Sequence, residues 1–349
     1  NLNVQQGASI SFADADDFIL DLWGWEQPKS INTIRGTVYV FPGGKMSGTT
    51  NKYFENFGTI YNAGEVSNIL NLGNPDKTKK PGTIVIADIT AKTGVSENTG
   101  VVNYQEFLAG VTVQDPNAKN TGEYIYTGPA GKNGKVNSAT KVNEELEGIN
   151  LAELNKAMVT IATITNDTLF ADAGSEVTTL KTLILKDGSA VAAYCVRDKK
   201  TNEIIDYQRG VLFQESKGTV IFEAGSAAKN VYFQNLKPMD DAHPGMVKSV
   251  LVKGNGQGSK AVCFDGGAEL KNNTMRIVSF YTKSNKDYAP ISFESANLTV
   301  NAGTTVVAEA LRSVDGTSST VVNDGTIKLA YASYVDTNIT LDGFDPVGR

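Results

Sequence analysis

The sequence has few of the residues that most often carry enzyme chemistry, and it has little charge. Its 349 residues include one histidine, two cysteines and two tryptophans. Charged residues make up 20% of the chain, a low share that argues against a coiled coil. The net charge of −6 argues against binding to nucleic acid, whose phosphates attract basic surfaces.

Long apolar runs are also missing. The longest, near Ala190 to Val196, falls far short of the roughly 20 residues that a membrane-spanning helix needs. We therefore expect no transmembrane segment in this chain. The chain begins at Asn1 rather than at a methionine, as expected of a processed or partial chain, so a signal peptide or anchor cannot be judged.

The scarce reactive residues do not form a known catalytic or metal-binding motif. Cys195 and Cys263 lack metal-type spacing, and both a disulfide and two unbonded thiols remain open. Asp240 and Asp241 lie just before His243, and a nearby carboxylate can orient a histidine that acts as a general base. Pro244 and Gly245 nevertheless indicate a surface turn. The chain has no Gly-x-Ser-x-Gly motif to supply a nucleophile, so we predict no catalytic residues.

Glycine, asparagine and threonine are abundant, at 34, 30 and 33 residues, and they recur in one pattern. A glycine and a threonine open short β-rich segments at Gly36–Val40, Gly58–Asn62 and Gly82–Ile86, which begin 22 and 24 residues apart. Looser copies begin at Gly218 and Gly325. Further short β-rich pieces lie near 177–185, 211–213, 231–233, 250–252, 277–281, 298–300 and 305–308.

This spacing predicts an all-β chain wound as a single-stranded right-handed parallel β-helix, or β-solenoid. A strand of four or five residues cannot bury its apolar face alone, but coils of 20 to 30 residues stacked in register form a continuous core. Val38, Ile60 and Ile84 are then expected at equivalent inward positions, with Asn62 at a corner. Tandem β-sandwiches are the alternative, because strands every 8 to 12 residues also suit that class.

One stretch interrupts the pattern. Residues 114–148 are rich in glycine, asparagine and lysine and predict an exposed, mobile insertion, in which 123–127 could pair as a hairpin strand. Asn150 can cap a short helix with Glu153 in its first turn. Charged loops at 198–202 and 284–287 are typical of excursions between coils.

The predicted organisation is an N-terminal cap with the first coils over 1–113, an insertion with a short helix over 114–158, and the remaining coils over 159–349.

Segments such as Phe54–Gly64 resemble the repeated coils of secreted surface proteins of Bacteroidetes, whose fold is a right-handed, pectin-lyase-like parallel β-helix. The segments Val220–Ser226 and Leu298–Thr304 are similar in kind. The resemblance implies a secreted or outer-surface location and an adhesive role. Its motifs specify geometry, so no catalytic residue is carried over from it.

Two clusters near the N-terminus are candidate binding sites. Asp14, Asp16 and Asp17 offer oxygen ligands for calcium, although they lack the glycine and glutamate of an EF-hand loop, and a capping turn is the alternative. Trp23 and Trp25 would share one face of a strand and form a platform for a sugar ring. Alternatively, the two indoles cover the open end of the first coil. No other cofactor is expected.

Two functions follow as hypotheses. The first is a non-catalytic cell-surface solenoid, structural or adhesive, that presents loops to an extracellular glycan or a surface protein. The second is a carbohydrate-active β-helix enzyme, either a polysaccharide lyase or a glycoside hydrolase, since its carboxylates would need neither histidine nor cysteine. A groove with converging carboxylates would distinguish the enzyme from the adhesive protein.

Overall fold

The structure is a computed structural model, and it divides into two compact units, Asn1–Thr127 and Gly128–Arg349. The boundary lies inside the predicted insertion. The residues that the structure describes are 1–11, 33–49, 53–76, 78–105, 107–115, 117–128, 148–171, 180–201, 203–208, 210–213, 218–235, 250–256, 258–267, 276–282, 288–314, 316–330 and 335–342.

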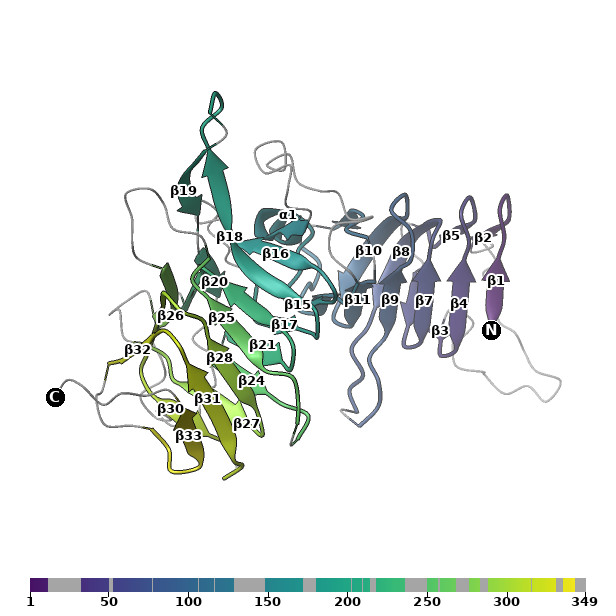
Figure 1. Ribbon diagram of the computed structural model, residues 1–349. Coiled ribbons are helices and arrows are strands. Elements are labelled where there is room, and N and C mark those ends of the chain that lie inside the picture. The colour runs from purple at the N-terminus through teal and green to yellow at the C-terminus, as the bar shows by residue number, and fades with distance from the viewer. Residues whose placement is uncertain are drawn as a thin grey trace. The chain divides into compact units, whose positions relative to one another are not determined.

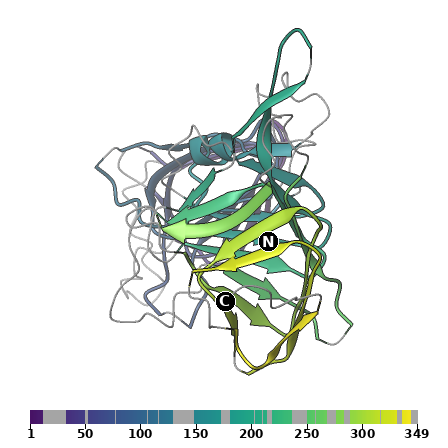
Figure 2. The same ribbon diagram turned by 60° about the vertical axis from the view of Figure 1, so that its left-hand side comes forward.

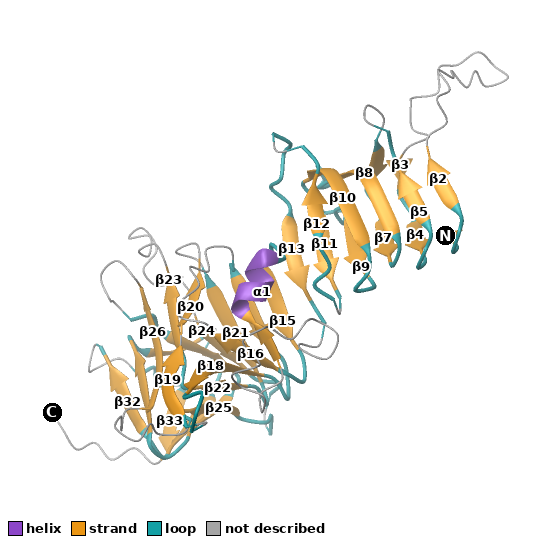
Figure 3. Cartoon of the chain, turned by 90° about the horizontal axis from the view of Figure 1, so that it is seen from above, coloured by secondary structure: helices purple, strands orange, loops and turns teal. Residues whose placement is uncertain are grey.

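The first unit consists of short parallel strands stacked coil on coil (Figures 1 and 3). One of its sheets, the β1–β13 sheet, contains in order β1 (Leu2–Val4), β4 (Thr37–Val40), β7 (Thr59–Asn62), β9 (Thr83–Ile86), β11 (Val101–Tyr104) and β13 (Glu123–Tyr126). The other, the β2–β12 sheet, contains β2 (Ser9–Ser11), β5 (Lys45–Ser47), β8 (Glu65–Asn71), β10 (Lys92–Asn98) and β12 (Val111–Val113), with β3 (Thr33–Ile34) paired to β6 (Phe54–Asn56) and β6 to β8.

The second unit has three stacks of parallel strands. The β15–β30 sheet contains β15 (Ile161–Ile164), β17 (Thr182–Leu185), β21 (Thr219–Glu223), β24 (Val250–Lys253), β27 (Ile291–Glu294) and β30 (Leu311–Ser313). The β14–β33 sheet contains β14 (Gly148–Asn150), β16 (Thr168–Ala171), β18 (Ala190–Arg197), β22 (Ala227–Lys229), β25 (Val262–Asp265), β28 (Asn297–Val300), β31 (Ser319–Asn323) and β33 (Ile339–Asp342). The β20–β32 sheet contains β20 (Gly210–Phe213), β23 (Tyr232–Asn235), β26 (Arg276–Thr282), β29 (Thr304–Ala308) and β32 (Thr326–Leu329).

The predicted all-β parallel solenoid is confirmed. Successive strands of each stack pair in parallel, whereas the strands of a β-sandwich are mainly antiparallel, so the tandem β-sandwich alternative is wrong. The expected short helix is present as α1 (Leu151–Lys156), directly after Asn150 and beside β14 and β16.

Two local predictions differ from the structure. The strand Glu123–Tyr126 does not form a hairpin: it pairs in parallel with β11 and buries Tyr124 and Tyr126, so it belongs to the coils. The loop that begins at Asp198 is not an excursion between coils but the turn of an antiparallel hairpin formed by the end of β18 and β19 (Ile204–Gln208). Figures 1 and 2 show this hairpin extending away from the other strands of the second unit. Most of the predicted mobile insertion, residues 129–147, lies outside the described residues.

The core of the first unit is built from rows of inward side chains, one from each coil. Val38 pairs with Ile60 and Ile60 with Ile84, as predicted, and all three are buried. The row continues through Val102 to Tyr124. Each strand alternates between inward and outward residues, so the register of the coils determines which side chains reach solvent.

Four buried phenylalanines of the second unit form one cluster. Phe222 comes from the β15–β30 sheet, Phe264 from the β14–β33 sheet, and Phe233 and Phe280 from the β20–β32 sheet. The ring centroids of Phe222 and Phe264 are 5.2 Å apart, and Phe233 and Phe280 stack at 5.0 Å. Because all three sheets contribute rings to one cluster, the cluster ties them together.

A glycine precedes β4, β7, β9, β11 and β13, and from Gly58 onward the coils come into backbone contact at this position. A Cβ atom on Gly58 would lie 2.2 Å from the carbonyl oxygen of Gly36, and one on Gly82 would lie 2.0 Å from that of Asn56. The carbonyl of Gly36 also accepts a hydrogen bond of 3.0 Å from the N–H of Thr59, and that of Gly58 accepts one of 2.8 Å from Thr83. Only a residue without a Cβ fits against that carbonyl while the bond is made.

A buried ladder of asparagines lies beside these glycines. Asn56 donates to the side-chain oxygen of Asn71 at 2.9 Å, and Asn71 donates to that of Asn98 at 2.8 Å. All three are fully buried, and each ends a strand of the β2–β12 sheet. Asn62 lies at a different corner, as predicted, where it donates to the carbonyl of Lys92 at 2.9 Å. These carboxamides satisfy backbone groups that the corners would otherwise leave unpaired.

Charges on the outer faces alternate in sign from coil to coil. In the first unit the register places Glu65 between Lys45 and Lys92, and the Lys45 and Glu65 side chains approach to 3.2 Å. In the second unit Lys186 pairs with Glu223 at 2.6 Å, and Lys253 pairs with Glu294 at 3.5 Å. Glu223 and Lys253 are also register partners. Like charges in adjacent coils would repel, so the alternation favours the observed register.

The glycine corner makes a prediction with a matched control. Gly58→Ala places a methyl group against the carbonyl of Gly36, so we expect the free energy of unfolding to fall by about 1–3 kcal/mol. Gly36→Ala changes the same motif where no atom lies within 4 Å, so we expect an effect within about 0.5 kcal/mol. Denaturant unfolding of both variants measures the difference. Equal effects would contradict the backbone contact.

Candidate functional site

The site residues predicted from the sequence lie outside the described part of the structure. This holds for Trp23 and Trp25, the expected sugar platform, and for Asp14, Asp16 and Asp17, the expected calcium ligands. His243 lies there as well. Among the residues that the structure does describe, no three or more histidines, cysteines, aspartates or glutamates are grouped so that they could hold a metal ion.

A cluster of tyrosines on the outer face of the β20–β32 sheet is the strongest candidate site. Tyr232 lies on β23, Tyr281 lies near the end of β26, and Tyr288 follows β26 in the chain. The ring centroids of Tyr232 and Tyr281 are 5.4 Å apart, and those of Tyr281 and Tyr288 are 6.2 Å apart. All three side chains are partly exposed. We call these three residues the tyrosine cluster.

Strand alternation places the cluster on the outside. Phe233 and Phe280, which precede or follow the tyrosines directly, are buried in the core, so Tyr232 and Tyr281 point the opposite way. In the parallel register Tyr232 lies opposite Ser279, and Gln234 lies opposite Tyr281. The uncharged polar residues Ser279 and Gln234 therefore flank the rings.

The backbone around the cluster holds the rings in place. Gly210 is the register partner of Tyr232 in the preceding strand, and a Cβ there would lie 2.7 Å from the Tyr232 ring. The ring thus lies directly over a position with no side chain, an arrangement in which an aromatic side chain covers a glycine. Tyr288 is fixed because it forms a bridge to Tyr281 and because the N–H of Ala289 donates to the carbonyl of Phe280 at 2.9 Å.

The phenol of Tyr281 has a raised pKa. Burial raises the pKa of Tyr281 to about 12, with further contributions from the neighbouring Tyr232 and Tyr288 phenols and from a side-chain hydrogen bond with Tyr232. A neutral phenol can donate and accept a hydrogen bond at the edge of the ring. The cluster therefore combines apolar ring surface with neutral polar groups.

The first unit has an aromatic pair with a different geometry. Tyr39 and Tyr61 are register partners, and their rings stack at 5.0 Å with 9° between the ring planes. In such a stack each ring covers a face of the other. In the tyrosine cluster the planes are inclined by 35° between Tyr232 and Tyr281 and by 70° between Tyr281 and Tyr288, so the rings do not cover one another in this way.

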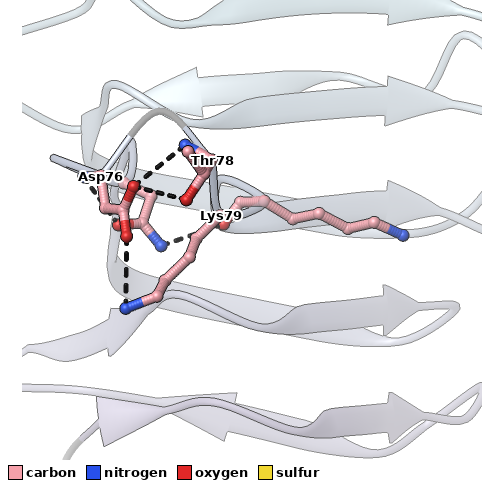
Figure 4. A network of polar contacts seen from close by, with 5 residues as sticks. Asp76, Thr78 and Lys79 are labelled. Carbon is pink, nitrogen blue, oxygen red and sulfur yellow. Dashed lines mark hydrogen bonds and ion pairs between the residues drawn. The ribbon is translucent and has the colours of Figure 1, made fainter.

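The described carboxylates with perturbed pKa values lie in turns, where Asp76 is exposed and Asp198 and Asp336 are partly exposed. In Figure 4, Asp76 accepts hydrogen bonds from the hydroxyl and the N–H of Thr78 and pairs with Lys79 at 3.4 Å. The bonds from Thr78 lower the pKa of Asp76. Backbone hydrogen bonds likewise lower the pKa of Asp198 and that of Asp336. A general acid for glycoside hydrolysis needs the opposite shift.

Cys263 has a free thiol and is partly exposed on β25. Burial raises its pKa, and the nearby Asp265 carboxylate adds to the increase. A raised pKa disfavours the thiolate, which is the nucleophilic form of cysteine. This environment does not activate Cys263.

Comparison with known proteins adds no family to this description. No protein-family model matches the chain, and neither a curated protein nor a solved structure matches it. No helix in the described ranges is long and apolar enough to cross a membrane.

Sequence reasoning missed the tyrosine cluster, although part of the signal was present. The β-rich segments around 231–233 and 277–281 were predicted as strands, and alternation within them separates each tyrosine from its core phenylalanine. The two tyrosines are nonetheless far apart in the sequence. Their proximity depends on the register of β23 and β26, which the sequence pattern does not provide.

The pKa of Tyr281 tests the geometry of the cluster. Burial is the largest cause of the raised pKa and remains in Tyr232→Phe, but the variant loses the hydrogen bond and the charge interaction with Tyr232. The pKa of Tyr281 should therefore fall part of the way toward its ordinary value of 10.0. Tyr61→Phe, in the other unit, should leave it unchanged. Carbon-13 labelling of the tyrosine rings and an alkaline NMR titration measure both. An unchanged Tyr281 pKa in Tyr232→Phe would show that the two phenols do not interact.

Proposed function

We propose that this protein is a non-catalytic β-solenoid of the cell surface that recognises an extracellular ligand through its outer faces. The observation that carries the proposal is that charged side chains and tyrosines occupy different parts of those outer faces. Outward carboxylates such as Glu65, Glu223 and Glu294 pair with lysines of adjacent coils. Three tyrosines instead gather on the outer face of the β20–β32 sheet, where the register partners of Tyr232 and Tyr281 are uncharged. Charges paired in this way support the stacking of coils rather than proton transfer.

The direction of the pKa shifts gives the proposal further support. Asp76, Asp198 and Asp336 have lowered pKa values, so these carboxylates are poor proton donors at neutral pH. The interior of the coils is filled by apolar rows and by the phenylalanine cluster, so the described coils offer ligands their outer faces and projections such as the β18–β19 hairpin. A rigid scaffold with such features suits recognition.

The secreted or outer-surface location is part of the same proposal and rests on the resemblance of the Asn-x-Gly-Thr corners to those of Bacteroidetes surface proteins. Antibody labelling of intact source cells, before and after treatment with an external protease, tests the location. Labelling of intact cells that the protease removes would support it. Labelling that requires permeabilised cells would contradict it.

A carbohydrate-active enzyme is the competing function. Incubation of the purified protein with plant, host and microbial polysaccharides, followed by assays for reducing ends and for unsaturated products, distinguishes the two. We expect no product from any substrate. Product that is released in proportion to protein concentration, and that is lost when a carboxylate pair is mutated, would show that the protein is an enzyme.

A further inference from the structure

We infer that the tyrosine cluster is a binding platform for the rings of a neutral glycan. The inference rests on the proposed function and gives it a site and a class of ligand. The platform consists of Tyr232, Tyr281 and Tyr288. The ring centroid of Tyr281 lies 5.4 Å from that of Tyr232 and 6.2 Å from that of Tyr288.

The chemistry of the cluster matches that of a sugar ring. A hexose presents C–H groups on its faces and hydroxyls around its edge, and a tyrosine presents an apolar ring face with a hydroxyl at one end. The partly exposed rings supply the apolar contact, while the tyrosine hydroxyls and the Gln234 carboxamide supply donors and acceptors. Burial raises the pKa of the Tyr281 phenol and so extends the pH range over which it stays neutral.

The register partners of the two strand tyrosines bear on the class of glycan. The residues opposite the two strand tyrosines are Ser279 and Gln234. Neither supplies a cation that would pair with a uronate or a sulfate, so the contacts favour neutral sugars over acidic ones.

The platform is also pre-organised. Tyr232 lies over Gly210, and Tyr281 lies on a strand that pairs with both β23 and β29. Tyr288 is held by the bridge to Tyr281. Rings that are already fixed lose little conformational entropy on binding, which favours affinity from a small contact area.

The test measures binding of neutral hexasaccharides by isothermal titration calorimetry, with cellohexaose, mannohexaose and laminarihexaose as probes and polygalacturonate as the anionic probe. We expect at least one neutral probe to bind and Tyr281→Ala to weaken it about tenfold or more. Tyr281→Phe keeps the ring and should retain most of the affinity. Tyr61→Ala, whose ring stacks on Tyr39, should leave the affinity unchanged. Circular dichroism and thermal unfolding confirm that each variant is folded.

The possible results separate the inference from the proposed function. Binding of a neutral probe that Tyr281→Ala does not weaken would overturn the platform and leave the recognition function standing. Binding of polygalacturonate alone, or of none of the four probes, would overturn the neutral-glycan assignment. Cleavage of a probe would instead overturn the non-catalytic function, whatever the variants do.

Discussion

The first unit depends on the contact between coils at the glycine corners that precede β7, β9, β11 and β13. There the carbonyl of one coil lies so close to the next that a Cβ on Gly58 would come within 2.2 Å of it. The same carbonyl accepts the first N–H of the next strand. Glycine is required for this contact, and threonine follows it as the first residue of a strand.

The asparagine ladder complements the glycine corner. A buried carboxamide whose partner is removed costs about 1–3 kcal/mol, so Asn56, Asn71 and Asn98 each penalise a coil that shifts out of register. The alternating lysines and glutamates on the outside favour the same register. Once the register is fixed, alternation along each strand determines which residues form the core and which form the outer face.

Much of the fold could be predicted because its signal is local. The Gly-Thr openers at 36, 58 and 82 mark strands of one sheet, and the inward positions of Val38, Ile60 and Ile84 follow from strand alternation. Position in the stack is not a local property. The opener at Gly325 begins β32, which lies in the β20–β32 sheet, while that at Gly218 begins β21 of the β15–β30 sheet.

The candidate site could not be predicted for the same reason. Tyr232 and Tyr281 meet because β23 and β26 are neighbours in the stack, and the chain between them forms strands of the other two sheets. Trp23 and Trp25, like Asp14 and Asp16, are close in the sequence, so they can be recognised as candidate pairs without the structure. In a solenoid, residues from successive coils are brought together by stacking, so sites form across coils.

In the first unit, buried carboxamides and glycine contacts fix the register of the coils. Hydrogen exchange followed by NMR tests it most directly. The side-chain N–H protons of Asn56 and Asn71 should exchange as slowly as the backbone N–H groups of Thr59 and Thr83, because all of them are hydrogen-bonded between coils. Exchange of the carboxamide protons at the rate of solvent-exposed asparagines, while the strand amides remain protected, would contradict the account.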